Sequence, residues 1–212
     1  MADDLKYGYK GAEPTQSFGN NTGVFDPNDI NNLIADNKWT TFGQLELIET
    51  QTVTTSVASV DFTSIESYNV HFLTYNNVQC TVDNKSVALQ FSVGGTFQTS
   101  GYQYAYQYGN AGGTFGESRT TSSSSLFISF QTGTAGNEKQ NGYSYLYNLT
   151  DSSKYSFQTM HSMGRRNVPD DMFVFGSGVY TTANQVDGIR IIPEATSNLD
   201  TGVFSLYGIR YS

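Results

Sequence analysis

Two histidines are the first side chains whose chemistry could suit a catalytic or metal site. His71 lies within a strand-like run, where we expect a hydrogen-bonded or exposed strand histidine rather than a ligand. His161 stands near a loop, and Asp170 or Asp171 could join it in a metal site or an acid–base pair. Because no second histidine is close in the sequence, the structural interpretation of His161 is favoured.

Carboxylates are more numerous, but no pattern pairs them. A glycosidase needs two facing carboxylates, and the sequence offers Glu46, Glu49, Glu66, Glu117, Glu138 and Glu194. No Gly-x-Ser-x-Gly motif is present, and Gly176-Ser177-Gly178 runs into the strand-like Val179-Tyr180 rather than into a helix. We therefore expect no catalytic residue, no metal ligand and no cofactor. Weak calcium binding by loop oxygens stays open, because it needs no recognisable spacing.

Four tyrosines in alternation form the most informative pattern. They are Tyr102, Tyr104, Tyr106 and Tyr108, interleaved with Gln103, Ala105 and Gln107. Alternation places them on one face of a strand, and each hydroxyl needs a partner if it is buried. Three interpretations follow: a packed sheet face within the subunit, a subunit interface, or a surface that stacks on sugar rings. We expect substitution of Tyr104 and Tyr106 to affect assembly or binding more than folding.

A single short helix is predicted near the start of the chain. Asp26 is a suitable N-cap, Pro27 then occupies the first helical position, and Asp29 lies in the first turn. The helix is too short to be stable alone in water. Its apolar residues are a candidate attachment surface: Phe25, Ile30, Leu33, Ile34 and Trp39. Residues 1–24 show no periodicity and are interpreted as an extended arm, while 25–44 form the helix and a link.

The chain from residue 45 to 212 reads as strands separated by turn signals. Runs of β-branched and aromatic residues predict about ten strands: 53–62, 68–75, 87–93, 102–108, 126–130, 143–149, 155–160, 172–180, 186–192 and 203–211. With no second helix signal, the pattern predicts an all-β domain, an antiparallel sandwich or jelly roll.

Composition narrows the function classes. The formal net charge is −8, the pI is about 4.5 and the basic residues are scattered, so we expect no binding to nucleic acid. No apolar run reaches membrane-spanning length and no secretory signal opens the chain, so membrane insertion is not expected. The single cysteine, Cys80, allows no internal disulfide and is interpreted as a small, partly buried residue.

Two segments resemble known virion proteins. Thr201-Gly202-Val203-Phe204-Ser205-Leu206-Tyr207-Gly208-Ile209 resembles the Gly-x-Phe-x-Leu-Tyr-Gly-Ile ending of many tailed-bacteriophage virion proteins, and Asp187-Gly188-Ile189-Arg190-Ile191 resembles the strand before that ending. Residues 23–39 are similar to the amino-terminal segment of structural proteins of marine and cyanobacterial phages. The resemblance implies a β-sandwich appendage on a head or tail, often oligomeric, with no catalytic residues to carry over.

The resulting expectation is a non-enzymatic virion protein. Its β-domain would be displayed on the particle, as a capsid decoration, fibre or tail appendage, and its N-terminal segment would attach it to another virion protein. A homo-oligomer is expected, with a trimer as one option. The alternative is a glycan-binding module that recognises a host receptor, and a polysaccharide depolymerase ranks third.

Overall fold

The computed structural model describes residues 27–35, 45–166 and 170–210. The chain divides into two units, Met1–Gly43 and Gln44–Ser212. The boundary expected between residues 44 and 45 lies one residue from this division. The expected arm, 1–24, and the link after the helix lie outside the described residues.

In the first unit the described residues form one helix, α1 (Pro27–Ala35). It begins at Pro27, as predicted, because proline has no N–H to leave unpaired in the first turn and Asp29 favours the positive end. None of these nine residues is buried, and the Ile34 side chain is 55% exposed. The apolar stripe of α1, formed by Ile30, Leu33 and Ile34, is therefore not buried.

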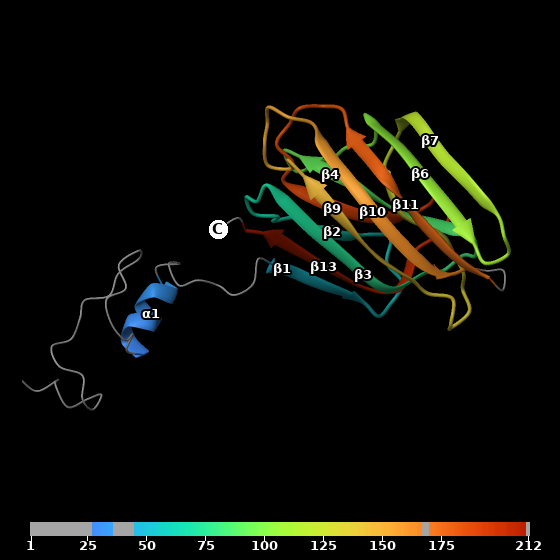
Figure 1. The fold of residues 1–212 in the computed structure, drawn as a ribbon, viewed down its shortest axis with the longest axis horizontal. Helices are drawn as coiled ribbons and strands as arrows, with labels where there is room; N and C mark the ends of the chain where they lie inside the picture. Colours follow the sequence, from blue (N-terminus) through green and yellow to red (C-terminus); the bar gives the residue numbers. More distant parts are fainter. Residues whose placement is uncertain (1–26, 36–44, 167–169, 211–212) are drawn as a thin grey trace, which may run out of the picture. The chain divides into compact units, whose positions relative to one another are not determined.

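The second unit is a sandwich of two antiparallel sheets, which confirms the predicted fold class (Figure 1). The larger sheet has eight strands in the order β1 (Leu45–Val53), β13 (Leu199–Ile209), β3 (Val70–Cys80), β9 (Gln140–Tyr147), β10 (Ser156–Arg165), β11 (Asp171–Tyr180), β6 (Tyr102–Asn110) and β7 (Phe115–Ser123). The smaller sheet orders β2 (Val60–Phe62), β12 (Gly188–Pro193), β4 (Lys85–Val93) and β5 (Thr96–Phe97), and β8 (Leu126–Thr132) also pairs with β4.

Three observed strands were not predicted: β5 and β7 lie outside the predicted runs, and only Val53 of β1 lies within one. The run 53–62 is divided, because β1 ends at Val53 and β2 begins only at Val60. Strand β7 was not expected, because its residues from Phe115 to Ser123 are mostly polar and none is buried. An edge strand with solvent on both sides needs no alternating pattern, so the signal that identifies inner strands is missing there.

The main core lies between the two sheets. Large side chains from both sheets are fully buried in it, including Leu73, Leu89, Phe91, Leu146 and Phe204. A smaller cluster forms where β8 packs on the far half of the large sheet, with Tyr106, Phe130, Met160, Met172 and Val174. The large sheet thus has one inner face covered by the small sheet and β8, and one outer face turned away from both.

Candidate functional site

The tyrosine stripe of β6 points into the sandwich. Tyr102 and Tyr106 are buried, and Tyr104 and Tyr108 are partly buried. The Tyr102 hydroxyl accepts a hydrogen bond from the Phe91 N–H at 2.8 Å and donates to the Gln98 carbonyl at 3.2 Å. The Tyr106 hydroxyl donates to Gln158 Oε1 at 2.9 Å.

For Tyr102 and Tyr106 this geometry matches the first of the three interpretations, a packed sheet face within the subunit. Burial raises the pKa of the Tyr102 and Tyr106 hydroxyls, which keeps both neutral, and their partners lie within the same chain. Tyr104 stacks on Tyr106 with ring centroids 4.7 Å apart, and Tyr108 packs on Phe130. Of the three interpretations, the sheet face within the subunit is the one the contacts match.

The two histidines lie on different strands, His71 on β3 and His161 on β10. His71 is buried, its Nε2–H donates to the Ile65 carbonyl at 2.8 Å, and burial lowers its pKa, so the ring is neutral. The expectation of a hydrogen-bonded strand histidine is confirmed.

His161 faces outward on β10 and pairs in register with Phe175. Asp171 pairs with Arg165, four residues further along the strand, or about 13 Å away. Asp170 is bound to Arg166 by two hydrogen bonds of 2.6 and 2.9 Å. The considered pairing of His161 with either aspartate is therefore wrong. Across the described ranges, no three His, Cys, Asp or Glu side chains are grouped as a metal site.

One pair of glutamates meets at a single hydroxyl. Tyr68 Oη donates to the Glu46 carboxylate and lies 3.3 Å from Glu66 Oε2, while Arg210 binds Glu46 at 2.7 Å. The Tyr68 hydrogen bond and Arg210 lower the pKa of Glu46, and burial together with Glu46 raises the pKa of Tyr68 to about 12. A glycosidase acid needs a raised pKa, so this ion-paired group suits a brace between β1 and β13 rather than catalysis.

The outer face of the large sheet carries the features of a binding surface. Pairing registers align outward residues into rows across the strands, one of which runs Arg119, Ala105, Ser177, Thr159, Tyr145 and Phe72. The surface is therefore formed by the side chains of strand residues and not by loops.

A second set of alternating tyrosines lies on this outer face. Tyr143, Tyr145 and Tyr147 of β9 are all partly exposed, and they form what we call the tyrosine row. Phe72 of β3 packs beside Tyr145 and Tyr143, with ring centroids 4.7 and 5.8 Å apart. His161 meets the Tyr143 ring edge-on at 5.9 Å. Together with Phe72 and His161, the tyrosine row forms a continuous aromatic surface across β3, β9 and β10.

Phenylalanines extend this aromatic surface toward β7. Phe173 and Phe175 are exposed neighbours on β11, with rings 6.2 Å apart and nearly parallel. Phe115 of β7 meets Phe173 across Gly109. A Cβ at Gly109 would lie 2.8 Å from both rings, so the glycine is what lets them close over β6.

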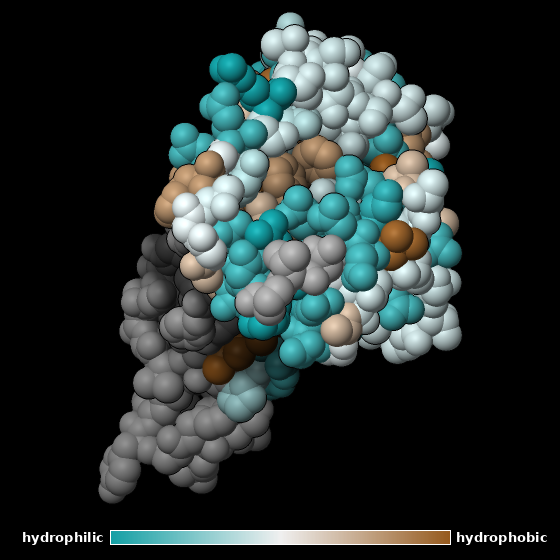
Figure 2. Space-filling view, turned by 90° about the vertical axis from the view of Figure 1, so that its right-hand side faces the viewer, coloured by the Kyte–Doolittle hydropathy of each residue, from teal (hydrophilic) through white to brown (hydrophobic). Residues whose placement is uncertain are grey.

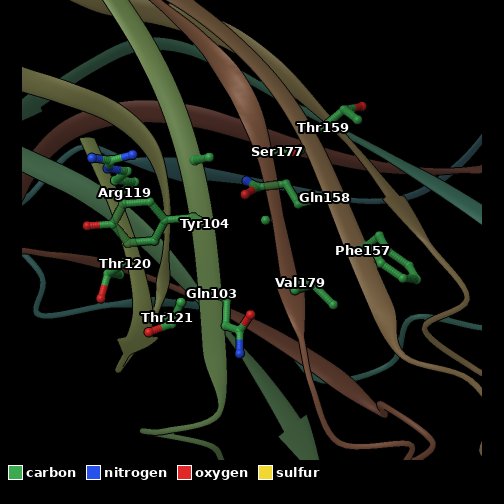
Figure 3. Close-up of a pocket in the computed structure, with 12 residues that line it drawn as sticks. Gln103, Tyr104, Arg119, Thr120, Thr121, Phe157, Gln158, Thr159, Ser177 and Val179 are labelled. Carbon is green, nitrogen blue, oxygen red and sulfur yellow. The ribbon is translucent and has the colours of Figure 1, made fainter. Parts of the chain in front are cut away.

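Three adjoining hollows mark the outer face. The largest, about 770 Å³, is lined mainly by outward residues of β7, β6, β11 and β10. Figure 3 shows Arg119 and Phe157 on opposite sides of it, with Ser177 and Val179 between them. A hollow of about 550 Å³ shares Thr159 with it, and one of about 500 Å³ shares Phe175 with the second. The small side chains Ala105 and Ser177 leave the space that the larger neighbours border.

The centre of the outer face has no formal charge. On the five strands β3, β9, β10, β11 and β6, all fully described, the outward residues between the strand ends include no Asp, Glu, Lys or Arg. Charges stand at the margin: Glu117 and Arg119 form an ion pair on β7, and Arg165 and Asp171 form one at the end of β10 and β11. Seen from the β7 side, apolar side chains show through a mostly polar surface (Figure 2).

Sequence reasoning singled out the tyrosines of β6 and did not single out the outward aromatic residues of β9 and β11. The signal was present: Phe173 and Phe175 alternate with Met172 and Val174, so β11 is apolar on both faces. Such a strand must either be covered on both sides or expose one apolar face. Of the attachment residues, Ile30, Leu33 and Ile34 lie on α1, and Phe25 and Trp39 lie outside the described residues.

Cys80 is buried in the core, where burial raises the pKa of its thiol. No helix in the described part of the chain is long and apolar enough to cross a bilayer.

In the comparisons with known proteins, no family model, no curated protein and no solved structure matched the chain.

Proposed function

We propose that this protein is a non-enzymatic structural component of a tailed-phage particle. Its β-sandwich unit is displayed on the capsid or tail, and its N-terminal unit attaches it to another virion protein. The observation that carries the proposal is the division of the chain: the sandwich unit has a closed core of its own, while the apolar residues of α1 are not buried. The resemblance of residues 23–39, 187–191 and 201–209 to phage virion proteins supports the same assignment.

The two other functions have weaker support. The glycan-binding alternative was based on the β6 stripe, where Tyr102 and Tyr106 are buried within the subunit. The depolymerase alternative needs a carboxylic acid with a raised pKa opposite a second carboxylate. The pair that meets at Tyr68 includes Glu46, whose pKa is lowered.

Attachment is tested with particles that lack the protein. We expect purified full-length protein to bind these particles and a fragment beginning at Gln44 to be soluble, rich in strand by circular dichroism, and unable to bind. A fragment that aggregates, or that decorates particles at the normal copy number, contradicts the proposal.

Two matched substitutions in the full chain locate the attachment on α1. Leu33→Asp places a charge within the apolar stripe, and Asn32→Asp places the same charge on the opposite side of the helix. We expect Leu33→Asp to abolish particle binding and Asn32→Asp to leave it unchanged. Equal binding by both variants would remove α1 from the attachment surface.

A further inference from the structure

We propose that the outer face of the eight-stranded sheet is the interface through which a second copy of this chain binds. The inference concerns the purified protein and does not depend on attachment to a particle. It rests on the exposed apolar area of this face, its charge, its side-chain chemistry and its shape.

The exposed apolar area approaches what a stable interface needs. Six side chains of this face are more than a third exposed: Phe115, Tyr143, Phe157, Met163, Phe173 and Phe175. Their exposed fractions, from 36% to 76%, amount to roughly 600 Å² if each side chain offers about 200 Å². A monomer rarely shows an apolar patch beyond about 300–600 Å², and a standard interface buries about 800 Å² per partner. Leu45 and Leu47 at the β1 edge add to this area.

The charge distribution of the outer face favours contact with a second copy of the chain. The whole chain carries a net charge of −8, so two copies repel each other in most orientations. The outer face is an exception, since its centre is uncharged and its margin holds two ion pairs of balanced sign, Glu117–Arg119 and Arg165–Asp171. Contact through this face brings together surfaces that do not repel.

The exposed side chains suit a protein better than a sugar. Phenylalanine has no hydrogen-bonding group and methionine only a weakly accepting sulfur, and Phe115, Phe157, Met163, Phe173 and Phe175 account for most of the exposed area. Interface cores are enriched in aromatic residues and methionine and depleted in charges, which is the composition found here.

The shape of the outer face allows the outer faces of two copies to pack together. Phe157 borders the largest of the three adjoining hollows, and Phe175 lies between the other two. In a two-fold arrangement each copy presents the same surface to the other, so a ring of one copy can occupy a hollow of its partner. Thr159 lies where the two largest hollows adjoin, near the centre of the face.

The test is the molar mass of the full-length protein by sedimentation equilibrium. We expect a defined oligomer at about 1–50 µM, a range in which an interface of this size commonly associates. The double substitution Phe157→Ser with Phe175→Ser is expected to weaken association by about 100-fold or more, as loss of two central aromatic anchors would. The control is Val82→Ser, which removes an apolar side chain of similar exposure, 39%, from the turn between β3 and β4.

A second variant keeps the proposal falsifiable if the double substitution disturbs folding. Thr159→Lys adds a charge at an exposed position in the centre of the face, where a second copy brings the same charge opposite. A monomeric Thr159→Lys protein with an unchanged circular dichroism spectrum supports the interface. A wild-type protein that stays monomeric, or variants that associate as the wild type does, overturn it. Binding of a monomeric wild type to a glycan array, lost in Thr159→Lys, also overturns it and assigns the face to a glycan.

Discussion

Strands β6 and β9 of the same sheet carry alternating tyrosines that have opposite roles. On β6, Tyr102 and Tyr106 point into the sandwich and each hydroxyl has a partner in the chain. On β9, Tyr143, Tyr145 and Tyr147 point outward: Tyr145 meets Tyr143 edge-on and stacks on Tyr147, and Phe72 packs against Tyr143 and Tyr145. A period of two therefore shows which residues share a face but not which face is covered. What decides the role is whether a second layer of structure lies above the strand.

The largest difference in the free energy of unfolding between the two strands is expected when one tyrosine ring is removed from each. Tyr106→Ala should lower the free energy of unfolding by about 3–5 kcal/mol, because a fully buried ring leaves a cavity. Tyr145→Ala should lower it by about 1 kcal/mol or less, the range of a cross-strand pair on a half-exposed face. Urea unfolding at one fixed protein concentration measures both, since association would otherwise shift the midpoint. Equal losses would show that the outer ring is also part of a closed core.

A smaller effect separates the hydroxyl of the buried stripe from its ring. Tyr102→Phe should cost about 1–3 kcal/mol at neutral pH, because the buried Phe91 N–H loses its acceptor. Burial raises the pKa of the Tyr102 hydroxyl above its ordinary value. The unfolded chain therefore ionises first, and the stability that this group contributes below about pH 10 is lost as the pH rises further.

Unfolding curves at pH 7 and at several values above pH 10 measure this loss. The wild type should lose stability across that interval, and Tyr102→Phe should lose less over the same interval. Parallel declines in the two proteins would mean that the Tyr102 hydroxyl is not protected in the folded state.

The smallest effect is expected at the margin of the outer face. Glu117 and Arg119 are 3.3 Å apart and well exposed, and exposed pairs contribute little. Glu117→Gln should change the free energy of unfolding by less than about 0.5 kcal/mol. If the same substitution changes the sedimentation equilibrium strongly, the contact lies at the β7 margin and not over the aromatic centre.

The sequence predicted the elements whose signals come from residues close together in the chain. Helix α1 begins at Pro27 because capping and proline signals are local, and β4 was recognised because Val87, Leu89, Phe91 and Val93 alternate with small or polar residues. The fold class follows from the number of such strands and the absence of a second helix signal.

What escaped prediction depends on contacts between distant residues. The inner position of Tyr106 depends on Gln158 and on β8 covering that half of the sheet, and no local pattern specifies either. Likewise, Asp171 is in register with Arg165 rather than His161, and that register is set by the pairing of β10 with β11. The exposed Phe175 is assigned to a surface only when the strand order is known.

The place of β13 between β1 and β3 sets the timing of folding in the cell. Glu46 at the start of the sandwich unit is ion-paired with Arg210, 164 residues later, and β1 has β13 as its neighbour in the sheet. A ribosome adding about 5–20 residues per second completes β13 roughly ten to thirty seconds after β1. During that interval β1 and the β13-facing edge of β3 have no native partner, and pairings so distant in the chain are slow to form. The sandwich unit can therefore close only after β13 has been synthesised, and a nascent chain that stops short of Leu199 leaves both strands open to pairing with other chains.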